Sequence, residues 1–276
     1  MYSSFATSPT ILLSMLALSM QWMNVNLCLP FQDLAREQFH AALRGRLPAL
    51  KRLQIITTGG NSVVTAFELA PNLHTVVLER LPPSMPWLQL NHFRGERLVG
   101  MDCLHVLRLG VSLLECKFSL VDEDIYEEAL LPPHLALRTL HLTDHTVCLD
   151  ILRILTLPAL SELNLDDGRD SVEQYHEVLS FLSRSRPPLQ RLSVQHGYPR
   201  LTHAFPFLLQ LSALEIPEVT VAEYSILLQD LRARDPATFL PNLKSLVISS
   251  WESLYYEAEQ PASVDCEVLA DALTQR

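Results

Sequence analysis

The chain has 276 residues, with 21 basic and 31 acidic side chains and a net charge of −10. Apolar residues make up 48 %, which predicts a sizeable core and excludes global disorder. The acidic balance argues against nucleic-acid binding, because neutralisation of phosphates by Lys and Arg supplies most of that affinity. The five cysteines are scattered without a CxxC pair, which favours structural thiols in a reducing compartment, the cytoplasm or nucleus.

The N-terminal stretch carries no charged residue before Asp33. Its apolar run, 11–20, is shorter than the roughly 20 residues of a membrane-spanning helix and lacks the basic start of a signal peptide. From residue 23 to 29 apolar and polar residues alternate, which predicts a half-buried strand after a helix over 11–20. Asp33 is placed to cap a second helix that ends near Leu43. We therefore predict an N-terminal cap over 1–46 and no membrane association.

A repeated leucine motif occurs throughout the rest of the chain. Its clearest copy is Leu160-x-x-Leu163-x-Leu165, within LTLPALSELNL. Counting this copy, eight matches are found, with first positions at Leu50, Leu73, Leu104, Leu137, Leu160, Leu189, Leu211 and Leu243. A looser match begins at Leu113, but it follows the one at Leu104 so closely that we assign no separate unit to it.

Spacings of 22 to 33 residues lie in or just above the range of leucine-rich repeats, about 20–29 residues. Each unit offers a short strand whose leucines need neighbouring units to become buried. Proline stands two residues before the first leucine in four copies, where it ends the preceding turn. We predict an α/β leucine-rich-repeat solenoid over 47–250, with a curved parallel sheet, helices on the convex side and an acidic capping helix over 251–276.

Helical patterns separate the strands. Ser171-Val-Glu-Gln174 and Thr220-Val-Ala-Glu223 resemble capping boxes, and apolar residues follow each at helical spacing. Residues 148–154 are predicted as a shorter helix.

Sequence signals for catalysis are weak. No phosphate-binding, dinucleotide-binding, nucleophile-elbow or HExxH motif occurs, so we expect no enzyme and no cofactor. His141 and His145 fall on a strand and the loop after it, which does not bring the two rings together, so no metal site is predicted. The acidic residues of 122–128 fit either a docking site for a basic partner or a solvated loop.

The residues between the core positions of each strand are predicted to line a concave face. Such extended surfaces suit protein ligands more than small molecules, although a sheet face without a dedicated partner is the alternative. The candidate partner-binding residues are Arg52, Gln54, Thr75, Glu79, Arg108, His141, Glu162, Asn164, Arg191 and Gln195.

Four segments resemble the leucine-rich region of fungal, mushroom-type F-box-like proteins: RLPALKRLQI, LTLPALSELNL, VLSFLSRSRPPLQRLSV and FLPNLKSLVI. Pro86-Trp-Leu-Gln-Leu90 is similar to that family's PW-x-Q-L element. The resemblance implies substrate recognition for an F-box-type ubiquitin ligase. We find no F-box-like segment ahead of the repeats, so we expect the ligase adaptor as a partner only of a longer form that has one. A repeat-only interaction scaffold is the alternative.

Overall fold

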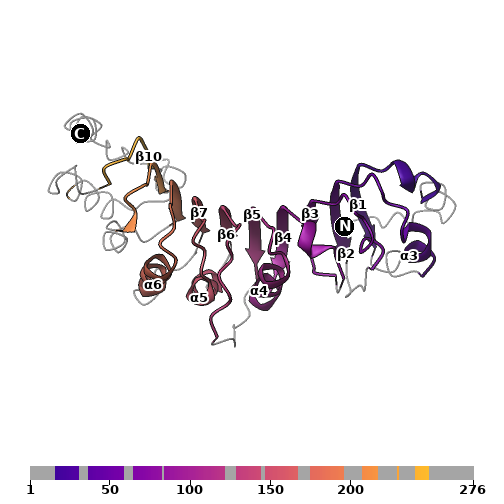
Figure 1. Ribbon diagram of the computed structural model, residues 1–276, viewed down its shortest axis with the longest axis horizontal. Helices are drawn as coiled ribbons and strands as arrows, with labels where there is room; N and C mark the ends of the chain where they lie inside the picture. Colours follow the sequence, from indigo (N-terminus) through magenta and orange to yellow (C-terminus); the bar gives the residue numbers. More distant parts are fainter. Residues whose placement is uncertain are drawn as a thin grey trace, which may run out of the picture. The chain divides into compact units, whose positions relative to one another are not determined.

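The structure is a computed structural model that describes residues 16–30, 37–58, 65–82, 84–121, 129–143, 147–166, 175–195, 207–216, 229 and 240–248. Its strands are β1 (Asn24–Pro30), β2 (Arg52–Thr58), β3 (Thr75–Leu78), β4 (His92–Leu98), β5 (Glu115–Leu120), β6 (Thr139–Thr143), β7 (Glu162–Asp166), β8 (Arg191–Gln195), β9 (Ala213–Ile216) and β10 (Ser245–Ile248) (Figure 1). Its helices are η1 (Ser19–Gln21), α3 (Glu37–Leu43), η2 (Trp87–Gln89), α4 (Gly100–Leu109), α5 (Val147–Ile154) and α6 (Tyr175–Ser185).

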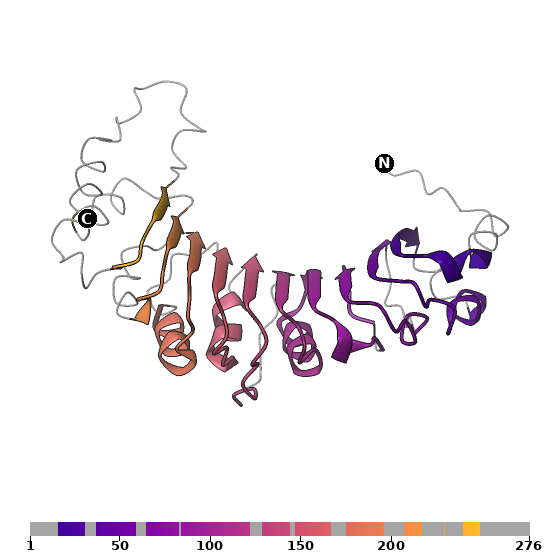
Figure 2. The same cartoon turned by 45° about the horizontal axis from the view of Figure 1, so that its top comes forward.

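The chain divides into two compact units. Unit 1 comprises 1–98 and 105–118, and unit 2 comprises 99–104 and 119–276. Within each unit the strands lie side by side in chain order, and neighbouring strands run parallel (Figure 2). A parallel α/β arrangement is therefore confirmed, and it is compatible with the predicted solenoid-type fold.

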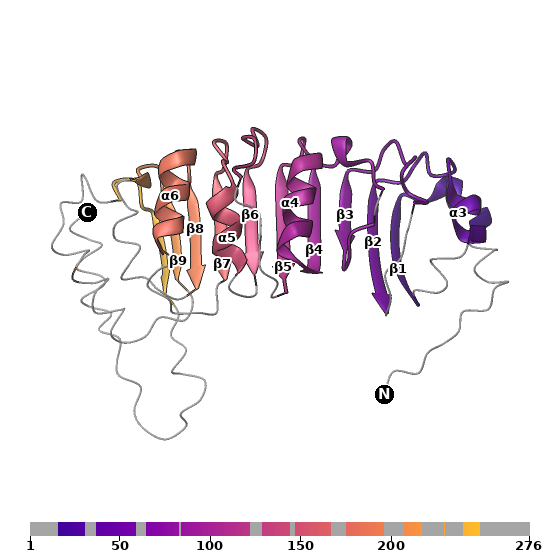
Figure 3. The same ribbon diagram turned by 90° about the horizontal axis from the view of Figure 1, so that it is seen from below.

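Helices cover one face of the sheet. In unit 2, α5 and α6 lie on the same side of β6, β7 and β8 (Figure 3). The side chains that point toward these helices form the core: Leu140, Leu163 and Leu192 are each at most 1 % exposed. Alternate side chains point to the other face, which we call the open face.

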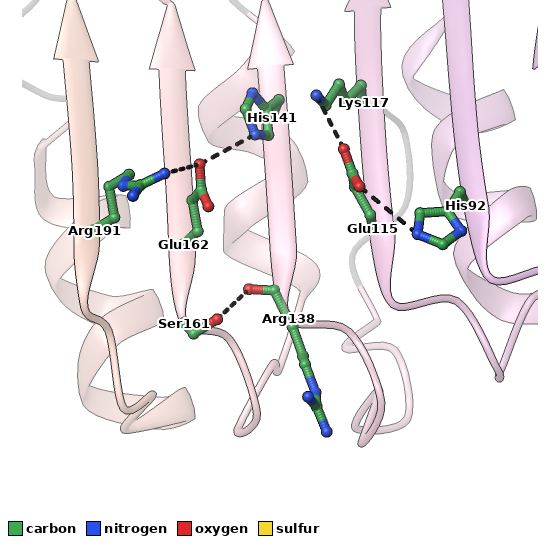
Figure 4. Close-up of polar contacts among 8 residues, drawn as sticks. All are labelled: His92, Glu115, Lys117, Arg138, His141, Ser161, Glu162 and Arg191. Carbon is green, nitrogen blue, oxygen red and sulfur yellow. Dashed lines mark hydrogen bonds and ion pairs between the residues drawn. The ribbon is translucent and has the colours of Figure 1, made fainter.

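Seven of the described strands, β2 to β5, β7, β9 and β10, are entered by the same hydrogen-bonded turn. The N–H of Leu160 donates to the carbonyl of Leu157 at 3.3 Å, and the N–H groups of Ser161 and Glu162 both donate to the carbonyl of Arg138 in the preceding repeat. The Ser161 hydroxyl donates to that same carbonyl at 3.1 Å (Figure 4). Equivalent paired N–H donors enter β2, β3, β4, β5, β8, β9 and β10. This recurrence defines a structural repeat independently of the leucine motif in the sequence.

The predicted strand at Leu104 is wrong. Leu104 and Leu107 lie in α4, where their i, i+3 spacing places both on the buried side of the helix. The match at Leu113, to which we assigned no unit, is the true one, because Cys116 and Phe118 are the buried positions of β5.

Strand β4 was also missed, because its third core position is a glycine. Leu90 and Phe93 occupy the first two positions and are buried, but Gly95 occupies the third. A Cβ on Gly95 would meet the side chain of Leu98, which fills the space that a leucine at 95 would take. The corrected first positions are Trp22, Leu50, Leu73, Leu90, Leu113, Leu137, Leu160, Leu189, Leu211 and Leu243.

Several local predictions are confirmed. The strand predicted over 23–29 is β1, the helix ending at Leu43 is α3, and the short helix over 148–154 is α5. In the part of 11–20 that the structure describes, residues 16 and 17 are helical and lead into η1. Both capping boxes, the acidic stretch of 122–128, His145 and the segment 251–276 lie outside the described residues.

Candidate binding face

The parallel register sets open-face side chains of unit 2 into rows. Glu162 of β7 lies opposite Thr139 of β6 and Arg191 of β8, and Asn164 lies opposite His141 and Ser193. Adjacent strands are about 4.8 Å apart, so neighbours along a row are within contact distance. The repeat therefore brings together residues that lie 23 to 29 positions apart in the sequence.

Glu162 is the centre of a charged group in unit 2. Its Oε1 lies 3.5 Å from an Arg191 guanidinium nitrogen and 3.7 Å from Nε2 of His141 (Figure 4). Both distances are long for hydrogen bonds, and Arg191 is exposed. The Arg191–Glu162 pair is the more exposed of the two, and exposed ion pairs contribute at most about 1 kcal/mol to stability. Arg191 can consequently exchange Glu162 for another partner at little cost.

Unit 1 repeats this arrangement. Glu115 of β5 lies 3.9 Å from Nε2 of His92, on the preceding strand β4, and 2.9 Å from Nζ of Lys117 (Figure 4). Arg94 and Glu96 pair at 3.1 Å along β4. In both units a histidine on one strand approaches a glutamate on the next, and a cation completes the group.

Most predicted open-face residues lie where we expected them. Residues at open-face positions of described strands are Arg52, Gln54, Thr75, His141, Glu162, Asn164 and Arg191, and Gln195 is the last residue of β8. Glu79 directly follows β3, which ends at Leu78. Arg108 is a correction, because it lies on α4 and not on a strand.

On β4 and β5, as far as the structure describes them, six open-face residues escaped the sequence prediction: His92, Arg94, Glu96, Glu115, Lys117 and Ser119. They follow from assigning β4 and β5 correctly. The usable signal was the alternation in HFRGERL and ECKFSL, because in both strands the second, fourth and last residues are buried. Gly95 and the strand predicted at Leu104 obscured it.

The thiol of Cys116 lies beneath this face. Cys116 points into the core between Glu115 and Lys117, and burial, with a smaller contribution from the Glu115 charge, raises the pKa of its thiol. Among the described residues, no group of three or more His, Cys, Asp or Glu is placed to hold a metal ion. No helix in the same residues is long and apolar enough to cross a membrane.

Comparisons with known proteins gave no match. No protein-family model, curated protein or solved structure matches this chain significantly.

Proposed function

We propose that the chain is a protein-binding module of the leucine-rich-repeat class that binds its partner on the open face. The observation that carries the proposal is the alignment of polar side chains from successive strands, such as Glu162 beside Arg191 and Asn164 beside Ser193. Five strands in each unit place these rows across roughly 19 Å, from a spacing of about 4.8 Å. That span matches a protein segment better than a small molecule.

The loose charge groups support this proposal. Glu162 and Glu115 each accept contacts from a histidine and a cation, and these pairs remain partly exposed. A partner that presents its own charges re-pairs them and gains orientation and specificity. Tightly buried ion pairs would resist such an exchange.

The specific role that we propose is substrate recognition for an F-box-type ubiquitin ligase. It rests on the resemblance of segments such as LTLPALSELNL to the repeat region of fungal F-box-like proteins. The repeats would hold the substrate, and an F-box carried by a longer form would bind the ligase adaptor.

A pull-down with the purified ligase adaptor tests this role. The present chain is compared with every longer transcript-derived form that adds residues ahead of Met1. The ligase role requires that at least one longer form retains the adaptor while the 276-residue chain does not. If no form retains it, the ligase role is wrong and a repeat-only scaffold replaces it.

A further inference from the structure

The first repeat lies beside the second in a register offset by 28 residues. Asn24 of β1 pairs with Arg52 of β2, and the carbonyl of Met23 accepts the N–H groups of Lys51 and Arg52 at 2.8 and 3.1 Å. The entry turns agree with this offset: Trp22 N–H donates to the Ser19 carbonyl, as Leu50 N–H donates to that of Leu47. Neighbouring positions on the two turns are therefore Leu18 and Arg46, Met20 and Pro48, and Met23 and Lys51.

The first of these turns exposes large apolar side chains. Leu18 is 57 % exposed, Met20 48 % and Met23 49 %. In the same stretch, Leu16 and Ser19 are buried, at 2 % and 0 % exposed. Three exposed apolar side chains within six residues form an apolar patch of a kind that marks interaction sites.

The second turn places cations against this apolar group. Arg46, Pro48 and Lys51 are all exposed. We call the six residues Leu18, Met20, Met23, Arg46, Pro48 and Lys51 the turn patch. No acidic residue occurs in the sequence between Glu37 and Glu68. Glu37 opens α3, roughly 10 Å along the helix axis from the end that leads to Arg46.

This charge is opposite to that of the rest of the chain. Residues 1–67 contain five basic and two acidic side chains, a net charge of +3, whereas the whole chain carries −10. The remaining residues therefore carry −13. An acidic partner is therefore attracted more strongly to this basic N-terminal part than to the acidic remainder of the chain, which favours docking at the turn patch.

We propose that the turn patch docks an acidic segment of a partner protein in which Asp or Glu alternates with apolar side chains. The apolar residues would pack on Leu18, Met20 and Met23, and the carboxylates would pair with Arg46 and Lys51. Unbranched methionine side chains adapt to different apolar partners. This site is separate from the open face and does not rest on the function proposed for it.

A protein segment fits better than a polyanion. Nucleic-acid platforms interleave cations with exposed aromatic side chains on which bases stack, whereas the turn patch presents leucine and methionine. Anionic membranes attract apolar and basic surfaces too, so vesicles form a separate arm of the test.

The test is an unbiased selection. Random 12-residue peptides displayed on phage are selected on the immobilised full-length chain and counter-selected on the Arg46→Glu/Lys51→Glu variant. The peptides are expected to be enriched in Asp and Glu interleaved with apolar residues. A selected peptide should bind the double variant, and separately Met20→Ser/Met23→Ser, at least tenfold more weakly than the wild type. Raising the salt concentration from about 50 to about 500 mM should weaken the wild-type complex.

Matched controls separate docking from folding. Arg138→Glu/Arg186→Glu reverses two exposed cations of unit 2 and should leave peptide affinity within about twofold of wild type. If circular dichroism shows that Arg46→Glu/Lys51→Glu does not fold, the milder variant Arg46→Gln/Lys51→Gln is used in its place. Cations that only balance the C-terminal dipole of α3 would alter thermal stability without changing peptide affinity, and this result overturns the proposal. Selection without acidic enrichment, or tighter binding of phosphatidylserine vesicles or a single-stranded oligonucleotide than of any peptide, also overturns it.

Discussion

The guanidinium of Arg184, on α6, donates two hydrogen bonds to the carbonyl oxygen of Leu155, from Nε at 3.1 Å and from a terminal nitrogen at 2.8 Å. The same terminal nitrogen donates to the carbonyl of Leu152 at 2.8 Å. These carbonyls lie at the C-terminal end of α5, where the helix no longer supplies its regular i+4 N–H donors. Burial lowers the pKa of Arg184, and the nearby Glu177 opposes that shift. Arg184 therefore ties two successive repeats together.

Arg184→Ala should lower the free energy of unfolding by about 2–3 kcal/mol, because it removes charge-assisted hydrogen bonds from partly buried carbonyls. Arg184→Lys should recover no more than about half of the loss, because a single ammonium cannot reproduce the planar donor geometry. Urea unfolding followed by circular dichroism measures both. The control is Arg153→Ala, at an exposed position on α5, which should change stability by less than about 0.5 kcal/mol. If Arg184→Ala and Arg153→Ala lowered the free energy of unfolding by equally small amounts, the hydrogen bonds of Arg184 would not stabilise the contact between the two repeats.

The space shared by Gly95 and Leu98 predicts coupling between them. Gly95→Ala alone should cost about 1–3 kcal/mol of unfolding free energy, because the new Cβ meets the Leu98 side chain. The Gly95→Ala/Leu98→Ala double variant should cost clearly less than the sum of the two single changes. Gly45→Ala serves as the control, because Gly45 has a φ of +73° and no atom near its Cβ position. The losses of unfolding free energy caused by Gly45→Ala and Leu98→Ala should add in the double variant. If the losses caused by Gly95→Ala and Leu98→Ala also added, the packing explanation would be contradicted.

His134 replaces a main-chain acceptor at the entry to β6. Its Nδ1 accepts the N–H of Leu137 at 3.2 Å, where most other repeats use the carbonyl three residues earlier. His134→Ala leaves this buried N–H without that acceptor and should cost about 1–3 kcal/mol. Asparagine offers a side-chain oxygen for the same turn and should recover most of the stability. Thermal and urea unfolding test the pair against His105→Ala, at an exposed position. A His134→Ala variant as stable as His105→Ala would rule out the acceptor role.

The thiols should differ sharply in reactivity. Cys28 is exposed, whereas Cys103, Cys116 and Cys148 are buried. Iodoacetamide followed by mass spectrometry should label Cys28 in the native protein and leave these three unmodified. Raising the pH to about 9.5 should not label Cys116 before global unfolding, because burial raises the pKa of its thiol. Labelling of Cys116 at the rate of Cys28 would contradict the packing of β5.

The raised pKa of Cys116 also determines in which direction the free energy of unfolding changes with pH. The unfolded thiol ionises near pH 8.5, whereas the folded one stays protonated to higher pH. The contribution of this thiol to the free energy of unfolding is therefore complete below about pH 8.5 and is lost as the pH rises above that value. Cys116→Ala should reduce the fall in unfolding free energy between about pH 8 and 10. An unchanged slope would show that this thiol does not contribute to it.

The leucine motif predicted the core well wherever apolar side chains fill all three of its core positions, as at Leu160, Leu163 and Leu165. It failed at β4, where Gly95 and Leu98 share one position between them. It also failed at α4, because Leu104 and Leu107 fit a helix face as well as a strand.

The candidate site was less predictable than the core. Open-face positions followed from the alternation along each strand, but their contacts depend on the register between strands. Glu162 and Arg191 are 29 residues apart, whereas Glu162 and His141 are 21 apart and meet diagonally. Unequal repeat lengths hide both pairs in the sequence.

The most direct test of the open face introduces the same residue on opposite sides of the sheet. Asn164→Arg and Thr75→Arg place a bulky cation on the open face of units 2 and 1, and Ser183→Arg places one on the exposed side of α6. Each folded variant and the wild type is used for affinity capture from a lysate with quantitative mass spectrometry. We expect at least one protein that wild type and Ser183→Arg retain equally and that an open-face variant retains at least tenfold less. Equal retention of every captured protein by all four chains would contradict binding through the open face.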